Sequence, residues 1–429
     1  MPSAMPADHA TRTRLAAWGE TSLLVVAVAL QWDLGASVGG DGYYRYQDLE
    51  ALLLRGDLHP QSPEGAGYSL ILPLLAAPLY LLGRPSGQPD VFVAYLNLLV
   101  YTALLPLAFV ALRGPLGAST ARRFLLLLLT GSMFTHHLSA FYAEVTATLF
   151  CGIGLWGVAQ QRTWGWFLLA VGAVSTPALL LPLAVVCAAQ AFADRRLKSF
   201  WPAGFAAGLY LAESRLRRGA FTSMHYLQDH ALGSDRIGFS NPLLSGVANI
   251  LTSFGKGLIF YVPGLFLPVP ASSLAPALLR WRRLMLLFTA GMVPVYAKWW
   301  DWSGDWFWGP RFFLFASLPA ALTLAVRLSR RSSPGALAVT VVATALSLWV
   351  GLDGALFGNA GLDFCHSGGE KLADLCRTTP RYSALWRPFL VSPRLGSREW
   401  LRIGFWGIVG ASLVGPALLR QVRARTTLE

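Results

Sequence analysis

The chain has 429 residues, of which 54% are hydrophobic and only 13% are charged. A soluble domain carries roughly 25% charged residues, and the mean hydropathy here is +0.49. These values exclude a soluble enzyme, a disordered chain and, despite a net charge of +13, a nucleic-acid binder. Four cysteines are too few for a disulfide-built secreted scaffold, so a multi-span helical membrane protein remains.

Apolar runs recur along the whole sequence. Lipid offers no hydrogen-bond partner to the backbone, so each run that enters a membrane is expected to be helical. The runs cover about 15–32, 68–83, 90–112, 123–141, 144–160, 164–176, 177–193, 200–213, 257–273, 284–300, 312–326, 334–350 and 402–419.

Basic clusters indicate which of these runs cross the membrane. They are Arg12 and Arg14; Arg113, Arg122 and Arg123; Arg162; Arg195, Arg196 and Lys198; Arg280, Arg282 and Arg283; Arg327, Arg330 and Arg331; and Arg420, Arg423 and Arg425. The positive-inside rule places such clusters in the cytoplasm. They share one side only if 68–83, which contains two prolines, forms a re-entrant or juxtamembrane helix. We therefore predict an all-α polytopic membrane protein with about 12 transmembrane helices, both termini cytoplasmic, and interfacial helices in the first outer loop.

We expect a single membrane domain, 1–429, in which most of the polar residues lie in long outer loops. These loops are 33–89, 214–256, 301–311 and 351–401. Function is therefore expected on the outer face of a bacterial cytoplasmic membrane, with the last loop forming a cap over the site. Orientation accounts for the basic excess, so no nucleic-acid partner is needed, while anionic membrane lipid adds attraction at the inner leaflet.

The first outer loop contains a carboxylate among glycines, Asp41, directly before an amphipathic stretch at 43–55. Tyr44 and Arg45, in this stretch, are candidates for binding the substrate. Glycine neighbours allow a substrate to approach the carboxylate closely. The alternative role of Asp41 is to cap that helix, and the two roles are compatible.

Glu144 is expected at the outer membrane surface, at the start of a span. An ionisable residue at that depth is a functional candidate, although Glu also complements the helix dipole at this end. An alternative is that His136 and His137 bind a divalent metal ion together with Glu144. We disfavour this alternative because adjacent histidines point apart on a helix. His137 is kept as a substrate-binding candidate.

Basic residues on the outer side break the positive-inside pattern. Lys256 lies between two glycines before the run at 257–273, which favours an anion site. Arg217 and Arg218 are instead expected to contact lipid headgroups.

The segment 298–312, KWWDWSGDWFWGPRF, combines aromatic and charged residues. An aromatic belt explains the tryptophans but not the acids and the arginine among them. Trp302, Asp305 and Arg311 are therefore candidates for lining a substrate site, with Arg311 offering its planar fork of donors to a phosphate.

The cysteines divide into two kinds. Cys365 and Cys376 lie in an outer loop and are expected to pair in an oxidising compartment. Cys151 and Cys187 lie inside apolar runs and are expected to remain free.

Several segments together resemble the GT-C superfamily of integral-membrane glycosyltransferases. They are the acidic first loop followed by YSLILP at 68–73, YAE at 142–144, STP at 175–177 and GPRFF at 309–313. The likeness spans roughly residues 15–330. Two departures are that the first-loop acid is single and that the second acid is Glu rather than Asp.

The resemblance implies transfer of a sugar from a polyprenyl-phosphate donor to a glycan or lipid acceptor, with inversion. Asp41 would be the base, Glu144 would orient the acceptor or the base, and Lys256 and Arg311 would stabilise the departing phosphate. No cofactor beyond the alternative divalent metal is implied. The competing hypotheses are a transporter, although no inverted repeat is visible, and a non-catalytic protein that binds lipid or glycan.

Overall fold

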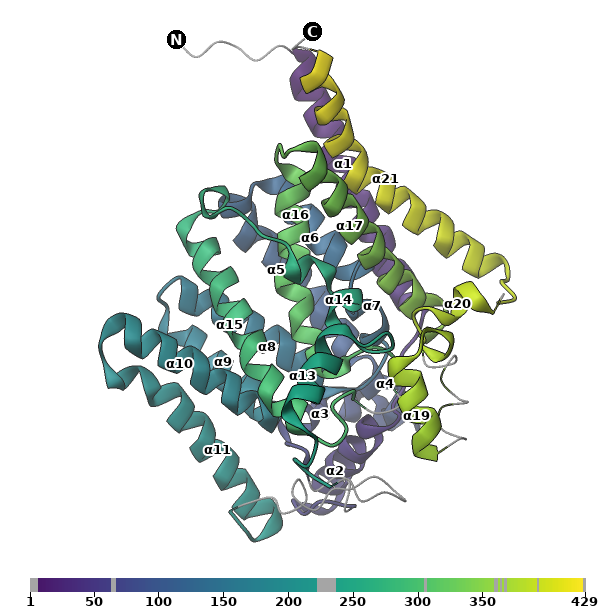
Figure 1. Ribbon diagram of the computed structural model, residues 1–429. Coiled ribbons are helices and arrows are strands. Elements are labelled where there is room, and N and C mark those ends of the chain that lie inside the picture. The colour runs from purple at the N-terminus through teal and green to yellow at the C-terminus, as the bar shows by residue number, and fades with distance from the viewer. Residues whose placement is uncertain are drawn as a thin grey trace.

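The computed structural model describes residues 7–62, 67–221, 237–304, 307–358, 362, 365, 369–391 and 393–426. These residues form a helical bundle (Figure 1). Its long helices are α1 (Ala7–Asp33), α5 (Leu96–Leu116), α11 (Trp201–Arg218), α15 (Pro276–Lys298), α17 (Pro334–Leu356) and α21 (Ser397–Thr426). Its medium helices are α6 (Ala118–Thr130), α8 (Ala143–Ala159), α9 (Thr163–Ser175), α10 (Leu180–Asp194), α13 (Leu243–Thr252) and α16 (Ser317–Ser329). The smaller ones are α2 (Asp41–Arg55), α3 (Ile71–Gly83), α4 (Pro89–Ala94), α7 (Phe134–His137), α14 (Leu258–Tyr261), α19 (Gly369–Thr378) and α20 (Arg387–Leu390).

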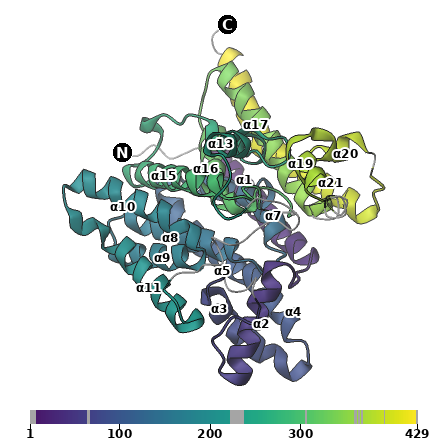
Figure 2. The same cartoon turned by 60° about the horizontal axis from the view of Figure 1, so that its bottom comes forward.

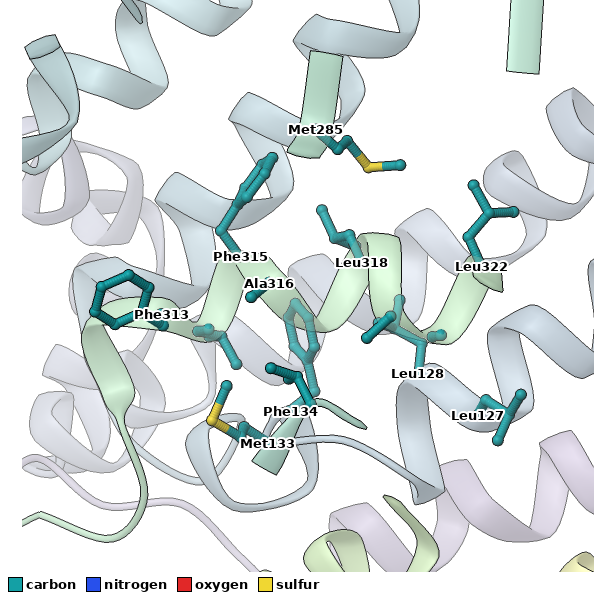
Figure 3. Close-up of a cluster of buried hydrophobic side chains, with 14 of the residues drawn as sticks. Leu127, Leu128, Met133, Phe134, Met285, Phe313, Phe315, Ala316, Leu318 and Leu322 are labelled. Carbon is teal, nitrogen blue, oxygen red and sulfur yellow. The ribbon is translucent and has the colours of Figure 1, made fainter. Parts of the chain in front are cut away.

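The core is built around α16, which packs against α6, α15 and α17. Nearly all of its residues are buried. Figure 3 shows Leu318 and Leu322 of α16 among Leu128, Phe134 and Met285 from neighbouring elements. A helix that is apolar all round is expected in such a central position.

The all-α polytopic architecture predicted from the sequence is confirmed. Among the described residues, six helical stretches are long and apolar enough to cross a membrane: Arg14–Asp33, Pro89–Leu116, Pro177–Asp194, Arg311–Ser329, Pro334–Leu356 and Ser397–Arg423. Shorter apolar helices, α8, α9 and α13 among them, add to these. The total of about 12 spans stays a prediction.

The apolar run at 257–273 is not the continuous helix expected from its composition. It consists of α14, a 3₁₀ turn (η5, Pro263–Phe266), an extended stretch and a second 3₁₀ turn, Ala271–Ser273. Prolines at 263, 268 and 270 remove backbone donors and break the helix. The η5 turn packs against α16 and α17, so this irregular backbone is covered by protein.

The helix α3 occupies most of the run at 68–83 that we expect not to cross the membrane. Its 13 residues correspond to about 20 Å of helix, shorter than the roughly 30 Å hydrocarbon core. It packs against α2 and α4 rather than lying alone. The helices α1 and α21 are in contact and run together to the top of Figure 1, at the end opposite α2. Figure 2 shows α2, α3 and α4 grouped together.

This arrangement leads to a topology prediction. Reporter fusions after Arg84 are expected to give an outer-face signal, and fusions after Arg113 a cytoplasmic one, because α5 is the first full span after α1. Alkaline phosphatase and a cytoplasmic fluorescent protein would report the two sides. A cytoplasmic signal at Arg84 would show that α3 crosses the bilayer.

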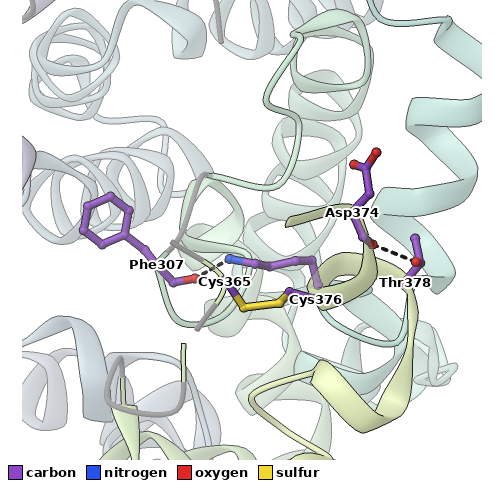
Figure 4. The surroundings of a disulfide bond; sticks show 6 residues. Phe307, Cys365, Asp374, Cys376 and Thr378 are labelled. Carbon is purple, nitrogen blue, oxygen red and sulfur yellow. Dashed lines mark hydrogen bonds between the residues drawn. A yellow bond between two sulfur atoms is a disulfide. The ribbon is translucent and has the colours of Figure 1, made fainter. Parts of the chain in front are cut away.

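The predicted disulfide between Cys365 and Cys376 is present (Figure 4), and Cys151 and Cys187 are buried free thiols. Both cysteines lie in the cap segment, 362–391, so the disulfide closes a loop within this segment. From this segment Ser383 Oγ and Trp386 Nε1 each donate to the carbonyl of Phe254 at 3.1 Å.

We expect the double substitution Cys365→Ser/Cys376→Ser to lower the free energy of unfolding by about 2–4 kcal/mol, because closing the loop restricts the unfolded chain. Thermal unfolding in detergent would measure the loss. Alkylation of denatured protein should label two thiols without reductant and four with it. Four labelled thiols without reductant would contradict the pairing.

Candidate active site

A short stretch of extended chain brings the first outer loop to the start of α8. Ser37 and Ala140 form an isolated parallel bridge, in which Ser37 N donates to Ser139 O at 3.0 Å and Phe141 N to Ser37 O at 3.3 Å. The bridge places the N-terminus of α2 beside the N-terminus of α8. Asp41 and Glu144 are thereby brought to one place.

Buried Asn97, in α5, fixes this crossing. Its amide nitrogen donates to the carbonyls of Ala140 at 2.7 Å and Tyr142 at 2.9 Å, and its oxygen accepts from Thr146 Oγ1 at 3.0 Å. Its partners lie in the first turn of α8 and in the segment that leads into it. Asn97 was not among the predicted site residues, because its only distinguishing feature in the sequence is a polar side chain within an apolar run.

Arg311 joins the two predicted carboxylates. Its Nη1 lies 2.7 Å from Asp41 Oδ2 and 3.5 Å from Glu144 Oε1. Arg311 and Glu144 are buried, and the second oxygen of Glu144 has no hydrogen-bond partner in the described part of the chain. One cation is therefore shared between two acids at the N-terminal ends of α2 and α8.

Aromatic rings and a carbonyl hold the Arg311 guanidinium in place. It lies 4.1 Å from the centre of the Phe307 ring and 5.1 Å from that of Phe312, and its Nε donates to Gly304 O at 3.0 Å. Stacking on a ring and bonding through a planar fork are properties that Lys does not share. The geometry at this position thus depends on arginine.

Asp41 is the first residue of α2 and does not cap it. The N-cap is Gly40, with φ of 50°, and no side chain bonds to the first-turn amides. A Cβ on Gly42 would lie 2.5 Å from the Phe141 carbonyl oxygen, so the glycines around Asp41 are needed for the close approach of the two segments. The capping role left open by the sequence is therefore not observed.

The charge of Asp41 depends on its neighbours. Burial would raise the pKa of this carboxyl, but the positive charges of Arg311 and Arg45, together with hydrogen bonds from Arg311 and Tyr68, lower it below its ordinary value. Asp41 is thus a carboxylate at neutral pH, whose basicity is held down mainly by Arg311.

Arg45, one turn further along α2, is a buried cation with free donors. Its guanidinium stacks over the Tyr68 ring at 4.0 Å, and its Nε and Nη1 have no hydrogen-bond partner among the described residues. A buried donor without an acceptor is costly. An anionic ligand next to Asp41 would supply the missing acceptor.

Lys256 contributes to the site through the aromatic segment. Its ammonium donates to the carbonyl of Phe307 (Figure 4) and, at 2.9 Å, to that of Gly309. It is buried, so it fixes the turn that leads to Arg311. A direct contact of Lys256 with phosphate stays a proposal.

His137 lies in a second polar cluster deeper in the bundle. Both of its ring nitrogens lack partners in the described residues. Its ring lies 6.1 Å from that of Trp308, and Trp308 Nε1 donates to buried Asp353 at 2.7 Å. Asp353 was not identified from the sequence because it lies at the end of a uniformly apolar run.

The remaining predicted residues lie around this site. Tyr44 is half-buried on α2, and Trp302 belongs to the main hydrophobic core. Asp305 lies outside the described residues. Asp301 was not predicted individually and forms a 2.9 Å ion pair with Arg377 of the cap segment, so this segment contacts the aromatic segment beside the site.

The expectation that Arg217 contacts lipid headgroups was wrong. Arg217 is 1% exposed and forms a 2.5 Å ion pair with Asp48 of α2. It also donates to the carbonyls of Leu58, at 3.1 Å, and Tyr68. Because Asp48 belongs to the first outer loop and is buried together with Arg217, this ion pair joins α11 to that loop.

The donor set gives little support to the alternative metal site. Among the described residues no group of three or more His, Cys, Asp or Glu side chains could hold a metal ion. Asp41 and Glu144 converge on Arg311 instead.

The fold and this site can be compared with known proteins. The crystal structure of ArnT from Cupriavidus metallidurans bound to undecaprenyl phosphate is similar to the chain, with a TM-score of 0.50 and 15% identity. The similarity covers 93% of this chain and 77% of that one. The chain shares the fold of that protein. The family resemblance read from the sequence is thus confirmed for the architecture.

The sequence itself is distant from characterised proteins. No protein-family model matches it, and no curated protein matches it. An identity of 15% supports a shared fold alone, and a fold does not determine which reaction its residues catalyse.

Proposed function

We propose that the protein transfers a sugar from a polyprenyl-phosphate donor to a hydroxyl acceptor at the outer face of the bacterial cytoplasmic membrane. The observation that carries the proposal is the Arg311 guanidinium shared by Asp41 and Glu144, with Arg45, two of whose nitrogens have no hydrogen-bond acceptor among the described residues, further along α2. The GT-C fold supports the same class of reaction, and the solved relative binds undecaprenyl phosphate.

A phosphodiester donor suits the charged groups of the site. Arg311 is already shared by Asp41 and Glu144, whereas two buried nitrogens of Arg45 lack an acceptor among the described residues. A buried polar group is stable only when it is paired, and the phosphate oxygens of a donor would pair these nitrogens.

The proposed reaction is one displacement at the anomeric carbon. The acceptor oxygen forms a bond to this carbon while the bond to the phosphate oxygen breaks, and the leaving polyprenyl phosphate keeps the electron pair. The Asp41 carboxylate takes the acceptor proton. Arg45 and Arg311 stabilise the charge that develops on phosphate, Glu144 orients the acceptor, and a single displacement inverts the anomeric configuration.

The position of Arg311 suggests that donor binding activates the base. Without ligand, the guanidinium keeps the pKa of Asp41 low. When phosphate oxygens accept hydrogen bonds from Arg311, its hold on Asp41 weakens and the pKa of Asp41 rises. The carboxylate would then become a stronger base only once the leaving group is in place.

The direct test uses purified protein in nanodiscs with a radiolabelled polyprenyl-phosphate sugar. Time-dependent release of polyprenyl phosphate that needs an acceptor and is lost in Asp41→Asn supports transfer. Binding of the donor without turnover under any acceptor would support the non-catalytic alternative. Donor movement between leaflets of sealed vesicles, unaffected by Asp41→Asn, would support a transporter.

A further inference from the structure

A polar cavity lies at the other end of α8 from the Asp41 site. Glu144 is in the first turn of this helix, and Val158, near its last turn, lines the cavity. The two ends are about 20 Å apart along the helix axis. The cavity therefore lies near the opposite membrane surface, framed by the turn after α8, the end of α10 and the first turns of α11 and α15.

Three cations converge on this cavity from separate parts of the chain. They are Arg162 after α8, Lys198 between α10 and α11, and Arg280 in α15. Each belongs to a different basic cluster of the sequence, and positive-inside orientation does not require the clusters to meet. Asp194 is the one carboxylate in the lining, so the cavity carries a positive surplus.

Hydrogen bonds orient part of the lining in advance. Arg280 Nη2 donates to Gln190 Oε1 at 2.8 Å, and Gln190 Nε2 donates to Asp194 Oδ2 at 2.6 Å. The turns are also fixed, since Gln161 and Arg195 have positive φ of 61° and 53° and end α8 and α10 abruptly. The cavity of about 390 Å³ falls within the size range of small-ligand sites, roughly 300–1,000 Å³.

Apolar side chains line part of the cavity, and others are exposed close to it in the sequence. Trp166 and Trp201 are part of its lining, and Trp201 packs on Phe167 with 4.9 Å between ring centres. Phe192, two residues before Asp194, and Leu197, directly before Lys198, are 85% and 84% exposed. Apolar groups so exposed in a membrane protein are expected to contact acyl chains. A ligand with a phosphate headgroup and hydrocarbon tails would place its phosphate at the cations of the cavity and its tails along the exposed apolar residues.

We propose that this cavity, lined by Arg162, Lys198, Arg280, Trp166 and Trp201, binds the phosphate headgroup of an anionic membrane lipid in the leaflet opposite the Asp41 site. The three cations hold the phosphate, and the exposed apolar residues contact the acyl chains. The site is separate from the proposed donor site and does not depend on sugar transfer.

Native mass spectrometry of the full-length protein with phosphatidylglycerol in neutral detergent tests the proposal without an activity readout. The variant Arg162→Gln/Lys198→Gln/Arg280→Gln is expected to retain one lipid fewer than the unmodified protein. Its affinity should fall roughly fivefold for each cation removed, or about 100-fold in total. The matched control, Arg14→Gln/Arg113→Gln/Arg331→Gln, removes the same charge from exposed positions in other basic clusters and should retain the lipid.

Several outcomes would overturn the proposal. Equal retention by both variants, or equal loss in both, would mean that the cavity is not a site. Stabilisation by millimolar inorganic phosphate but not by phosphatidylglycerol would assign the cavity to a soluble phosphate compound. If the triple variant does not fold, the single substitution Lys198→Gln at an exposed position gives the same test, with an expected loss of roughly fivefold.

Discussion

Replacement of Asp41 by Asn is expected to lower turnover by about 10²-fold or more while leaving the protein folded. This is the usual size of a general-base contribution. The substitution keeps the shape of the side chain. The start of α2 does not depend on the Asp41 carboxylate as a cap, since the N-cap is Gly40 and no side chain bonds to the first-turn amides. Arg311 keeps Glu144 as an ionic partner at 3.5 Å. Donor turnover and thermal unfolding, measured on the same nanodisc preparation, separate catalysis from folding.

The matched control is Asp33→Asn. Asp33 also forms an ion pair with an arginine, Arg402, at 2.9 Å, but it is half exposed and lies at the end of α1. Turnover of this variant should stay within about twofold of the unmodified protein, because exposed pairs contribute about 0–1 kcal/mol. A fully active Asp41→Asn protein would remove Asp41 from the mechanism and make Glu144 the candidate base.

Which residues could carry chemistry was largely apparent from local sequence. Glu144 and Arg311 are ionisable residues at the ends of apolar runs, where a charge is costly unless it has a use, and Asp41 is a carboxylate among glycines in the first outer loop. That one guanidinium contacts both acids does not follow from those local patterns, because Arg311 and Asp41 are 270 positions apart. The family resemblance supplied the expectation that they share a site.

What sequence reasoning missed has a common physical origin, which is pairing at long range. Arg217 has a basic side chain at a predicted membrane edge, and only its buried bond to Asp48, 169 positions away, shows that it joins two elements. Asn97 looked like part of an apolar span until its bonds to Ala140 and Tyr142 placed it at the crossing of two loops.

The fold shows the same division between local and long-range information. Hydropathy predicted the all-α polytopic class because lipid demands helices. It failed at 257–273, where prolines interrupt the helix. Such a segment is stable only because α16 and α17 cover it, and hydropathy cannot tell protein from lipid as the apolar neighbour.

Arg311→Lys is expected to lower turnover roughly 10- to 100-fold without unfolding the protein. Lys keeps the positive charge beside Asp41, but it loses the bond to Gly304 at 3.0 Å and the stacking on Phe307. A hydrogen bond to a charged group contributes about 1.5–3 kcal/mol, which corresponds to that change in rate. The matched control is Arg123→Lys, whose buried 2.9 Å pair with Glu20 joins α6 to α1 away from the site. It should change stability but not the turnover of folded protein.

Arg311→Gln separates the positive charge from the geometry. With the guanidinium present, the pKa of Asp41 is lowered, so the active carboxylate form persists as pH falls through the ordinary carboxyl range and is lost only below it. In Arg311→Gln the guanidinium is absent, and mainly Arg45 then opposes the rise in pKa that burial causes. The pKa of Asp41 should therefore increase. The acid limb of kcat/KM is then expected to move to higher pH in Arg311→Gln and to stay nearly in place in Arg311→Lys. Identical acid limbs in all three proteins would show that the titration of Asp41 does not control the reaction.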